Sequence, residues 1–282
     1  MLTTRFAPSP TGQLHLGHAF SAAIAHQAAR EADGRFLLRI EDLDPTRSRP
    51  EFVSAIEDEL SWLGLVWDGE PVVQSNRGGA YAEALETLKK RGLVYPCFCT
   101  RSDIAAALSA PHGPAAAHYP GTCRALPDNP EQRASMAHSW RLDSSKAVAI
   151  TGLPSWIERD GRRFTAARDD IDDEILARKD APASYHLACV VDDAECRVSL
   201  VVRGMDLRSS TPVQRLLQML LGLPEPEYLH HPLVVHDDGR RLAKRDLAPT
   251  LRALRDSGVD GGELASELVE GRLPAGFRLA EA

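Results

Sequence analysis

The sequence lacks an apolar run long enough to span a membrane, and the residues after Met1 lack the apolar core of a signal peptide. These absences favour a cytoplasmic protein. Internal repeats and low-complexity tracts are missing as well. The 282 residues, 43% of them hydrophobic and 26% charged, are typical of a soluble globular chain with one large domain or two ordinary ones.

An excess of positive charge is also lacking. The 33 lysines and arginines against 40 acidic residues give a net charge of −7, which argues against a general nucleic-acid coat but leaves room for a local basic groove. Cysteine is scarce: there are five, and three of them lie between residues 97 and 123. This usage suits a reducing compartment and a bound metal better than a disulfide framework.

The segment from residue 3 to residue 30 carries the strongest local pattern. Its first residues (TTRFA) are β-prone, a run of proline and glycine follows, and residues 19–30 are rich in helix formers. A strand, a tight turn and a helix N-terminus form an anion site, because free backbone N–H groups and the positive end of the helix dipole face the ligand.

Two histidines stand at the start of this predicted helix. His15 and His18 are three residues apart, so both rings would lie on one face of the first turn. Gly17 between them lets a flat base or a ribose approach the backbone closely. Imidazoles that donate hydrogen bonds without a fixed full charge suit a triphosphate whose α-phosphorus is attacked. Since four residues carry little information, two ordinary surface histidines are the alternative.

A second strand is expected at Arg35–Ile40. With the first strand and the helix it makes a βαβ unit, which predicts a parallel, Rossmann-like sheet. Ligands collect at the carboxyl ends of such strands, so Glu41 would point its carboxylate into the crevice and pair with the ammonium group of an amino-acid substrate. The alternative is a solvated acid in a turn.

The alternation of strands and helices then breaks. Helices are expected at Pro50–Leu63 and Gly78–Arg91, but the segment from residue 94 to about residue 184 fits no βα rhythm, and we interpret it as an insertion. Within it, Arg159–Arg163 predicts a hairpin turn with arginines at its tip. These arginines would either touch an RNA backbone or form a solvated basic turn.

Three cysteines of the insertion have the spacing of metal ligands. Cys97, Cys99 and Cys123 can supply three thiolates to a tetrahedral zinc ion. On chemistry alone, His118 or His112 would be the usual fourth ligand. A site with four protein ligands has no open position and would be structural. The alternative is three reduced cysteines without a metal.

Strands are expected again at Tyr185–Val191 and Arg197–Val202. Arg203 directly follows the second one, again where a crevice should lie. Its guanidinium can form a bidentate, charge-assisted pair with a carboxylate. That pair would recognise a side-chain carboxylate of a ligand and reject the corresponding amide, which would confront the guanidinium with a donor. A structural arginine is the alternative.

The last part of the chain predicts helices at Thr211–Leu221, Pro249–Asp256 and Gly262–Glu270. Before the last two helices, residues 239–246 place Lys244 in a basic loop. A mobile loop that brings such a cation onto a departing pyrophosphate acts electrostatically, most strongly in the transition state. After Lys244 only 38 residues remain, fewer than the roughly 50 of the smallest ordinary domains.

Several stretches together resemble one family. RFAPSPTG followed by HLGH (5–18), IEDLD-x-x-R (40–47) and VVRG-x-DL (201–207) resemble the signatures of the glutamyl and glutaminyl branch of the class I aminoacyl-tRNA synthetases. RLAKR (241–245) resembles their KMSKS signature, but Arg241 replaces a lysine and Ala243 replaces a serine. The lost hydroxyl predicts slower or weaker use of ATP.

The resemblance covers essentially the whole chain and implies an α/β fold. This fold has a class I synthetase Rossmann-like parallel sheet, a zinc-containing α+β insertion and a short helical C-terminal extension. Residues 1–93 would be the first half of the catalytic domain, 94–184 the insertion with the zinc module, and 185–248 the second half, ending in the KMSKS-like loop. Residues 249–282 would be a helical stub without an anticodon-binding domain.

The resemblance also implies the role of each site residue. The catalytic residues would be His15, His18 and Lys244. ATP, as a substrate with Mg²⁺, would bind to these three and to Pro8, Gly17 and Arg241. Glutamate would bind to Arg5, Ala7, Ser9, Glu41, Tyr185 and Arg203. The structural zinc would bind to Cys97, Cys99, Cys123 and Tyr119, with His118 as runner-up to the tyrosine.

The function implied is that of the truncated paralogues of glutamyl-tRNA synthetase. These activate L-glutamate with ATP in the absence of tRNA and transfer it to the queuosine base at the wobble position of tRNA(Asp). The residues themselves support only the activation half. The alternatives are a truncated synthetase acting on a tRNA 3′ end, a non-catalytic RNA-binding or regulatory paralogue, and a pantothenate-synthetase-like ligase of the same nucleotidyl-transferase fold.

Overall fold

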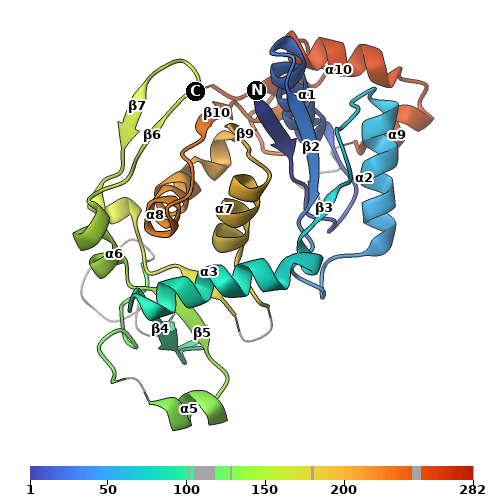
Figure 1. Ribbon diagram of the computed structural model, residues 1–282. Coiled ribbons are helices and arrows are strands. Elements are labelled where there is room, and N and C mark those ends of the chain that lie inside the picture. The colour runs from blue at the N-terminus through green and yellow to red at the C-terminus, as the bar shows by residue number, and fades with distance from the viewer. Residues whose placement is uncertain (101, 105–117, 128, 179–180, 243–248, 282) are drawn as a thin grey trace.

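The computed structural model of the protein describes residues 1–100, 102–104, 118–127, 129–178, 181–242 and 249–281 (Figure 1). It begins with strand β1 (Thr3–Phe6), helix α1 (Leu16–Glu31) and strand β2 (Arg35–Ile40). β1 and β2 pair in parallel, with Thr3 opposite Arg35. This confirms the predicted βαβ unit, in which two buried, β-prone segments flank a helix rich in alanine.

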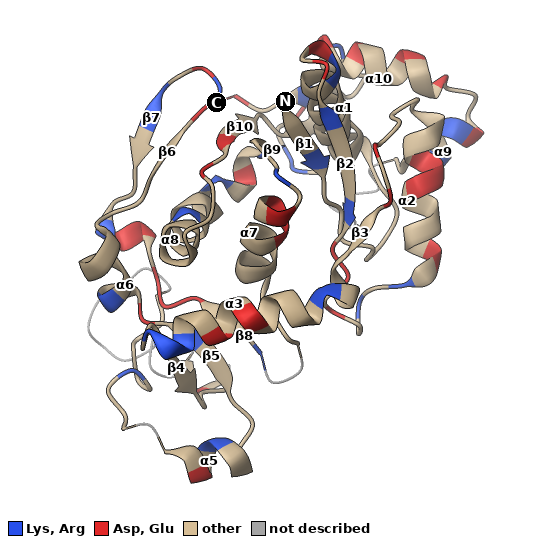
Figure 2. Cartoon of the chain, in the orientation of Figure 1, with Lys and Arg blue, Asp and Glu red and all other residues tan. Residues whose placement is uncertain are grey.

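Two parallel sheets lie edge to edge. β2 also pairs in parallel with β3 (Val72–Val73), and β9 (Leu200–Gly204) pairs in parallel with β10 (Glu227–His231). The backbone N–H of Ser199 donates to the carbonyl oxygen of Thr3 at 3.0 Å, which places β9 beside β1. Strands β10, β9, β1, β2 and β3 therefore follow one another across the molecule, as Figure 2 shows.

Three predicted helices are confirmed around these sheets: α2 (Pro50–Trp62), α3 (Gly78–Lys90) and α8 (Thr211–Leu221). Short 3₁₀ turns precede α3 and α8, at Gln74–Arg77 and Met205–Ser210. α8 ends at Gly222, whose φ of 66° is a left-handed conformation that favours glycine.

The strand predicted at Tyr185–Val191 is wrong. This segment starts helix α7 (Tyr185–Glu195), in which residues 187–193 are all buried. α7 packs against α3 and α8, and even its Asp192 and Asp193 are buried, so no exposed polar face marks it as a helix in the sequence. The apolar run of such a helix cannot be told from a buried strand by periodicity alone. The strand predicted at Arg197–Val202 is confirmed as β9, displaced toward the C-terminus.

The segment interpreted as an insertion is built from antiparallel strands. β4 (Val94–Cys97), β5 (Ser139–Leu142) and β8 (Ile175–Ala177) form one sheet. β6 (Ser155–Ile157) and β7 (Arg163–Thr165) form the hairpin predicted around Arg159–Arg163. The segment also contains α5 (Pro130–Ser135), α6 (Ser144–Thr151) and a 3₁₀ turn at Arg168–Asp170.

The C-terminal part contains α9 (Leu251–Asp256) and α10 (Gly261–Val269), close to the predicted helices. Strand β12 (Phe277–Leu279) follows and pairs antiparallel with β11 (Val234–His236). We expected a purely helical extension, and this strand shows that the expectation was wrong. Three residues are too few for their alternation to stand out in a sequence. α10 lies so close to α2 that a Cβ added at Gly261 would come within 2.2 Å of the carbonyl oxygen of Trp62.

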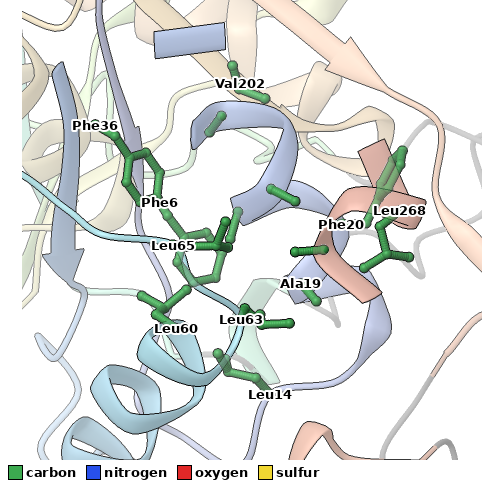
Figure 3. Close-up of a cluster of buried hydrophobic side chains, with 14 of the residues drawn as sticks. Phe6, Leu14, Ala19, Phe20, Phe36, Leu60, Leu63, Leu65, Val202 and Leu268 are labelled. Carbon is green, nitrogen blue, oxygen red and sulfur yellow. The ribbon is translucent and has the colours of Figure 1, made fainter. Parts of the chain in front are cut away.

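Two hydrophobic clusters hold these layers together. One joins α1, β1, β2, α2 and α10 and includes Phe6, Phe20, Leu60 and Leu268 (Figure 3). The other lies around α3, α7 and α8. Among the described residues, every helix falls short of the length and apolar character that a membrane crossing requires. The first cluster fixes the helix and strands from which the site is built.

Candidate active site

A cleft with a volume of about 740 Å³ lies where the carboxyl ends of β1, β2 and β9 meet. Each residue predicted to bind ATP or glutamate lines this cleft wherever the structure describes it, which it does for Arg5, Ala7, Pro8, Ser9, His15, Gly17, His18, Glu41, Tyr185, Arg203 and Arg241. Lys244 and Ala243 lie outside the described residues. Residues as far apart in sequence as Arg5 and Leu242 therefore line one cleft.

The two histidines cap the N-terminus of α1. Nδ1 of His15 accepts a hydrogen bond from the backbone N–H of Gly17 at 3.1 Å, and Nδ1 of His18 accepts one from the backbone N–H of His15 at 3.2 Å. A nitrogen that accepts carries no proton, so each neutral imidazole holds its proton on Nε2. The ring centroids are 3.9 Å apart. The cap thus fixes two side-by-side Nε2–H donors at a helix N-terminus.

A chain of buried ion pairs links the strand ends. Asp193 on α7 accepts from Nε of Arg5 at 3.0 Å and also pairs with Arg39, whose Nη2 donates to Glu41 at 2.9 Å. The acidic end of α7 is visible beside β1 and β2 in Figure 2. Burial would raise the pKa of Asp193, but Arg5 and Arg39 hold it at about 2. Asp193 is therefore an anion that orients both arginines.

The environment of Glu41 suits a positively charged ligand. Burial raises the pKa of its carboxyl group despite the neighbouring Arg39. A raised pKa means that the anion is poorly stabilised by the protein alone, so an ammonium group arriving from the cleft would supply the missing counter-charge. Burial likewise raises the pKa of Tyr185, which keeps that phenol neutral beside Glu41.

Asp193 and Arg39 were not identified as site residues from the sequence. The predicted strands at Tyr185–Val191 and Arg197–Val202 leave Asp193 in the connection between them. In the structure it lies on helix α7, which replaces the first of these strands. A usable signal was Arg39 itself, which stands inside the otherwise apolar segment FLLRI. A buried arginine is usually paired with an acid, so that position predicts a carboxylate supplied either by another part of the fold or by a ligand.

Arg203 is 3% exposed at the end of β9. Its Nη1 donates to Oε1 of Gln214 and its Nη2 to Oγ1 of Thr211, both at 2.7 Å, and its Nε donates to Nε2 of His230 at 3.1 Å. The guanidinium also lies 5.4 Å from the centre of the Tyr228 ring. Within the described ranges no carboxylate pairs with Arg203, so a buried cation faces the cleft without an acidic partner.

The three cysteines of the segment interpreted as an insertion lie close together. Sγ atoms of Cys97, Cys99 and Cys123 lie within 4.8 Å of one another, the last two 3.5 Å apart. The hydroxyl of Tyr119 lies 3.3 Å from Sγ of Cys97 and 3.5 Å from Sγ of Cys99. Tetrahedral zinc with bonds of about 2.3 Å places its sulfur ligands roughly 3.8 Å apart, so this donor set fits a zinc ion.

The two histidines considered as a fourth ligand are placed differently. Nδ1 of His118 lies 3.8 Å from Asp172, and its side chain is 44% exposed. His112 lies outside the described residues. The geometry thus favours the Tyr119 hydroxyl over His118 as the fourth donor.

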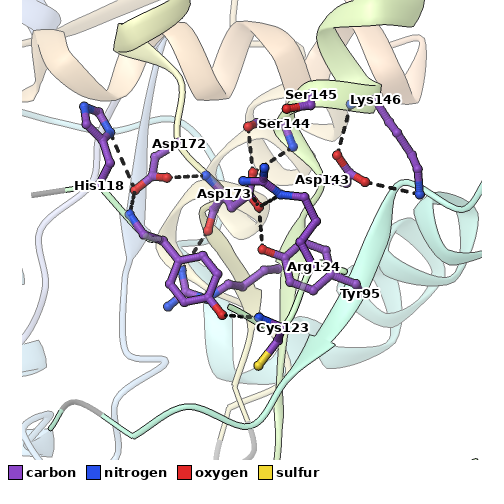
Figure 4. A network of polar contacts seen from close by, with 12 residues as sticks. Tyr95, His118, Cys123, Arg124, Asp143, Ser144, Ser145, Lys146, Asp172 and Asp173 are labelled. Atoms are coloured by element: carbon purple, nitrogen blue, oxygen red, sulfur yellow. Dashed lines mark hydrogen bonds and ion pairs between the residues drawn. The ribbon is translucent and has the colours of Figure 1, made fainter. Parts of the chain in front are cut away.

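Two adjacent aspartates hold the segment that carries Tyr119 and Cys123 (Figure 4). Asp172 accepts from the backbone N–H of Tyr119 at 2.8 Å. Asp173 is fully buried and pairs with Arg124, next to Cys123, at 2.6 Å. Both carboxylates therefore bind protein groups of the segment that carries Tyr119 and Cys123.

The fold and the cleft define a class I tRNA synthetase. The family model for the catalytic domain of class I tRNA synthetases for glutamate and glutamine (E and Q) matches residues 1–268, so the chain belongs to this family.

Several relatives within the family resemble the chain over most of its length. The chain is 45% identical to a glutamyl-Q tRNA(Asp) synthetase from Rhodobacter capsulatus, covering 93% of the chain and 98% of the relative. It is also 45% identical to one from Nocardia farcinica, covering 94% and 83%. The chain is thus similar to glutamyl-Q tRNA(Asp) synthetases over nearly all of its length.

Solved structures give the same architecture. A glutamate-tRNA synthetase from Elizabethkingia anophelis superimposes with a TM-score of 0.81 at 26% identity, covering 97% of the chain. A glutamate tRNA ligase from Elizabethkingia meningosepticum, in complex with its amino acid, superimposes with a TM-score of 0.80. The chain spans 62% and 60% of the lengths of these two proteins. The parallel α/β fold expected from the sequence is confirmed.

Proposed function

We propose that the cleft activates L-glutamate with ATP in the absence of tRNA and that the protein then transfers the glutamate to the queuosine base of tRNA(Asp). The observation that carries this proposal is the pair of opposed charges in one cleft. Arg203 is a buried cation without an acidic partner among the described residues, and Glu41 is a carboxylate poorly stabilised by its surroundings. An amino acid with an acidic side chain satisfies both.

Activation joins the α-carboxylate of glutamate to the α-phosphorus of ATP. A carboxylate oxygen attacks, the bond from the α-phosphorus to the bridging oxygen breaks, and pyrophosphate leaves with its Mg²⁺. Nε2–H groups of His15 and His18, at the positive end of α1, donate to the phosphates as charge builds up on them. Arg241 and Lys244 would bind the departing pyrophosphate, and Pro8 and Gly17 would border the adenosine.

Glutamate would lie between the strand ends. Its side-chain carboxylate would bind Arg203, its ammonium Glu41, and Arg5, Ala7, Ser9 and Tyr185 would surround the chain of the substrate. The Ala243 substitution in the KMSKS-like loop predicts slow activation, because a hydroxyl contact to ATP is lost.

Transfer requires a hydroxyl group of the acceptor to attack the carbonyl carbon of glutamyl-adenylate, with AMP leaving. A second cavity of about 270 Å³ borders Ser9, Glu41 and Tyr185 from another side and would give the acceptor access to that carbonyl. The choice of queuosine in tRNA(Asp) is supported by the names of relatives that match the chain over most of its length.

Zinc is proposed for the cysteine cluster, with Cys97, Cys99, Cys123 and Tyr119 as its ligands. When bound there it would serve to hold the insertion together, since four protein ligands leave no position for a substrate. No step of the proposed reaction passes through it.

The test has two stages. Glutamate-dependent exchange of pyrophosphate into ATP is measured without RNA, and then glutamate incorporation is measured into tRNA(Asp) with and without queuosine. We expect exchange without RNA, and incorporation only into the queuosine-containing tRNA, through a bond that survives removal of the 3′ end. Absence of exchange would favour a regulatory paralogue. Esterification of the 3′ end would favour an ordinary glutamyl-tRNA synthetase.

A further inference from the structure

Arg203 does not stand alone behind the cleft. Its Nε donates to Nε2 of His230 at 3.1 Å, and Nδ1 of His230 lies 2.8 Å from Oε1 of Glu158. The side chains of His230 and Glu158 are 1% and 10% exposed. Arg203 lies on β9, His230 lies on β10, and Glu158 directly follows β6. We call this hydrogen-bonded series from Glu158 through His230 to Arg203 the relay, and it crosses from the segment interpreted as an insertion to the cleft.

One protonation state satisfies every contact of His230. Its Nδ1–H donates to Glu158, and its Nε2 lone pair accepts from Arg203. The hydroxyl of Thr211 lies 3.3 Å from the same Nε2, and the Tyr228 ring lies parallel to the imidazole with the ring centroids 5.8 Å apart. Burial and then Arg203 lower the pKa of His230 to about 4. A protonated ring would set Nε2–H against the N–H of Arg203.

Glu158 supplies a negative charge opposite the positive charge of Arg203, with the His230 ring between them. It accepts from Nε1 of Trp156 at 3.0 Å and is held by the hairpin, while the neighbouring Arg159 pairs with Glu227 instead. In the described part of the chain, His230 is the sole basic side chain within ion-pair distance of Glu158. Its negative charge therefore reaches Arg203 through the imidazole.

The relay also determines which donors of Arg203 remain for a ligand. A guanidinium has five N–H bonds. His230 takes the one on Nε, Gln214 takes one on Nη1, and Thr211 takes one on Nη2. One N–H remains on each terminal nitrogen, which is the fork that a carboxylate accepts with two oxygens and an amide cannot.

We propose that Glu158 and His230 are positioning residues that orient the guanidinium of Arg203 and so set the preference for a side-chain carboxylate over an amide. This inference rests on the proposed glutamate site at Arg203. Neither side chain lines the cleft in which the substrate would bind. Their effect is on glutamate selectivity and not on ATP.

The test compares His230→Leu, which removes the acceptor, with His230→Gln, whose amide oxygen can still accept from Arg203. In glutamate-dependent ATP–pyrophosphate exchange, we expect His230→Leu to raise the KM for glutamate about tenfold to a hundredfold, the scale of a hydrogen bond to a charged group. The KM for ATP should stay unchanged. The ratio of kcat/KM for glutamate to that for glutamine should fall, and His230→Gln should restore most of it.

Two further variants separate positioning from simple destabilisation. Glu158→Gln keeps an acceptor for His230 but removes the charge, so its loss of selectivity should lie between those of the two His230 variants. His26→Gln changes another partly buried histidine, which packs edge-on against Phe36 at 5.2 Å, and should alter neither KM. Thermal unfolding of each variant gives the size of any general destabilisation.

The outcomes distinguish this inference from the proposed function. If the unmodified protein shows no glutamate-dependent exchange, the proposed function fails. If it exchanges normally but His230→Leu keeps the glutamate KM and selectivity, the positioning role is wrong. A parallel rise in the KM for ATP, or equal losses in His230→Leu and His230→Gln, would also overturn it, because both would indicate a structural role alone.

Discussion

The cleft and the cysteine cluster are organised in opposite ways. The cleft lies on strand ends backed by a large apolar core, and its charges are fixed by buried partners such as Asp193. The cysteine cluster has a core of four buried residues, Tyr95, Cys97, Tyr119 and Cys123, of which three are the proposed ligands. An apolar core keeps its shape without a ligand, whereas a core made of ligands depends on what they bind. Each region can therefore be broken without the other.

Arg203→Ala should have the largest effect on the cleft. It removes one half of the charge pair proposed with glutamate, which costs about 3–5 kcal/mol, or roughly a thousandfold in kcat/KM for glutamate. The far-ultraviolet circular dichroism and the metal content should not change. Arg159→Ala, an exposed arginine paired with Glu227, serves as the control. Unchanged glutamate kinetics in Arg203→Ala would refute the assignment of the glutamate pocket.

Cys99→Ser should break the other region. With one thiolate gone, we expect zinc, measured by elemental analysis, to fall from about one per chain to near zero. Limited proteolysis should then cut the insertion faster, while ATP–pyrophosphate exchange changes little. Cys196→Ser, a free cysteine outside the cluster, should keep the metal. A parent protein that contains no zinc would contradict the metal assignment.

Gly17→Ala sharpens the account of the histidine cap. A Cβ there would lie 3.1 Å from Cε1 and 3.2 Å from Nδ1 of His15, so the ring must shift. We expect roughly a tenfold loss in kcat/KM for ATP, the scale of about one hydrogen bond, without a change in the KM for glutamate. Gly79→Ala on α3 is the matched control, since nothing lies within 4 Å of its added Cβ. Equal values of kcat/KM for ATP in the two variants would show that the histidine cap has no role in binding ATP.

Acid should destabilise the fold in two steps. Burial lowers the pKa of His186 and His230 to about 4, so between pH 6.5 and 4 the unfolded chain binds more protons and the free energy of unfolding falls as the pH falls. The loss is on the order of 1–3 kcal/mol for each histidine. Asp193, with a pKa of about 2, adds its loss only from about pH 4 to 2.

Urea unfolding across this range measures the first step. His230→Gln should flatten the dependence between pH 6.5 and 4, whereas His26→Gln, with its smaller burial, should flatten it less. A free energy of unfolding that stays constant down to pH 4.5 in the parent protein would show that these histidines are not held neutral.

The sequence predicted those parts of the site whose positions follow from the geometry of a parallel sheet. Arg5, Glu41 and Arg203 each lie at or next to the end of a strand, and parallel strands end at one edge of a sheet, so their meeting in one cleft could be foreseen. The meeting of the two histidine rings could be foreseen from their spacing, but not its form, because His15 precedes the helix as its extended N-cap and does not lie on the first turn.

What could not be foreseen depends on tertiary partners. Asp193 lies 188 residues from Arg5 in sequence, and it was hidden in a run that reads as strand and connection but folds as α7. His230 and Glu158 meet across two regions of the chain, at a sequence separation of 72. No local pattern records such pairs, because they arise only once the layers have packed.

The most direct test of the central claim is a crystal structure of the protein with a non-hydrolysable analogue of glutamyl-adenylate. We expect the side-chain carboxylate of the analogue on Arg203, its ammonium group beside Glu41 and its phosphate mimic within hydrogen-bond distance of the imidazoles of His15 and His18. An analogue bound outside this cleft, or bound in it with its carboxylate away from Arg203, would contradict the account.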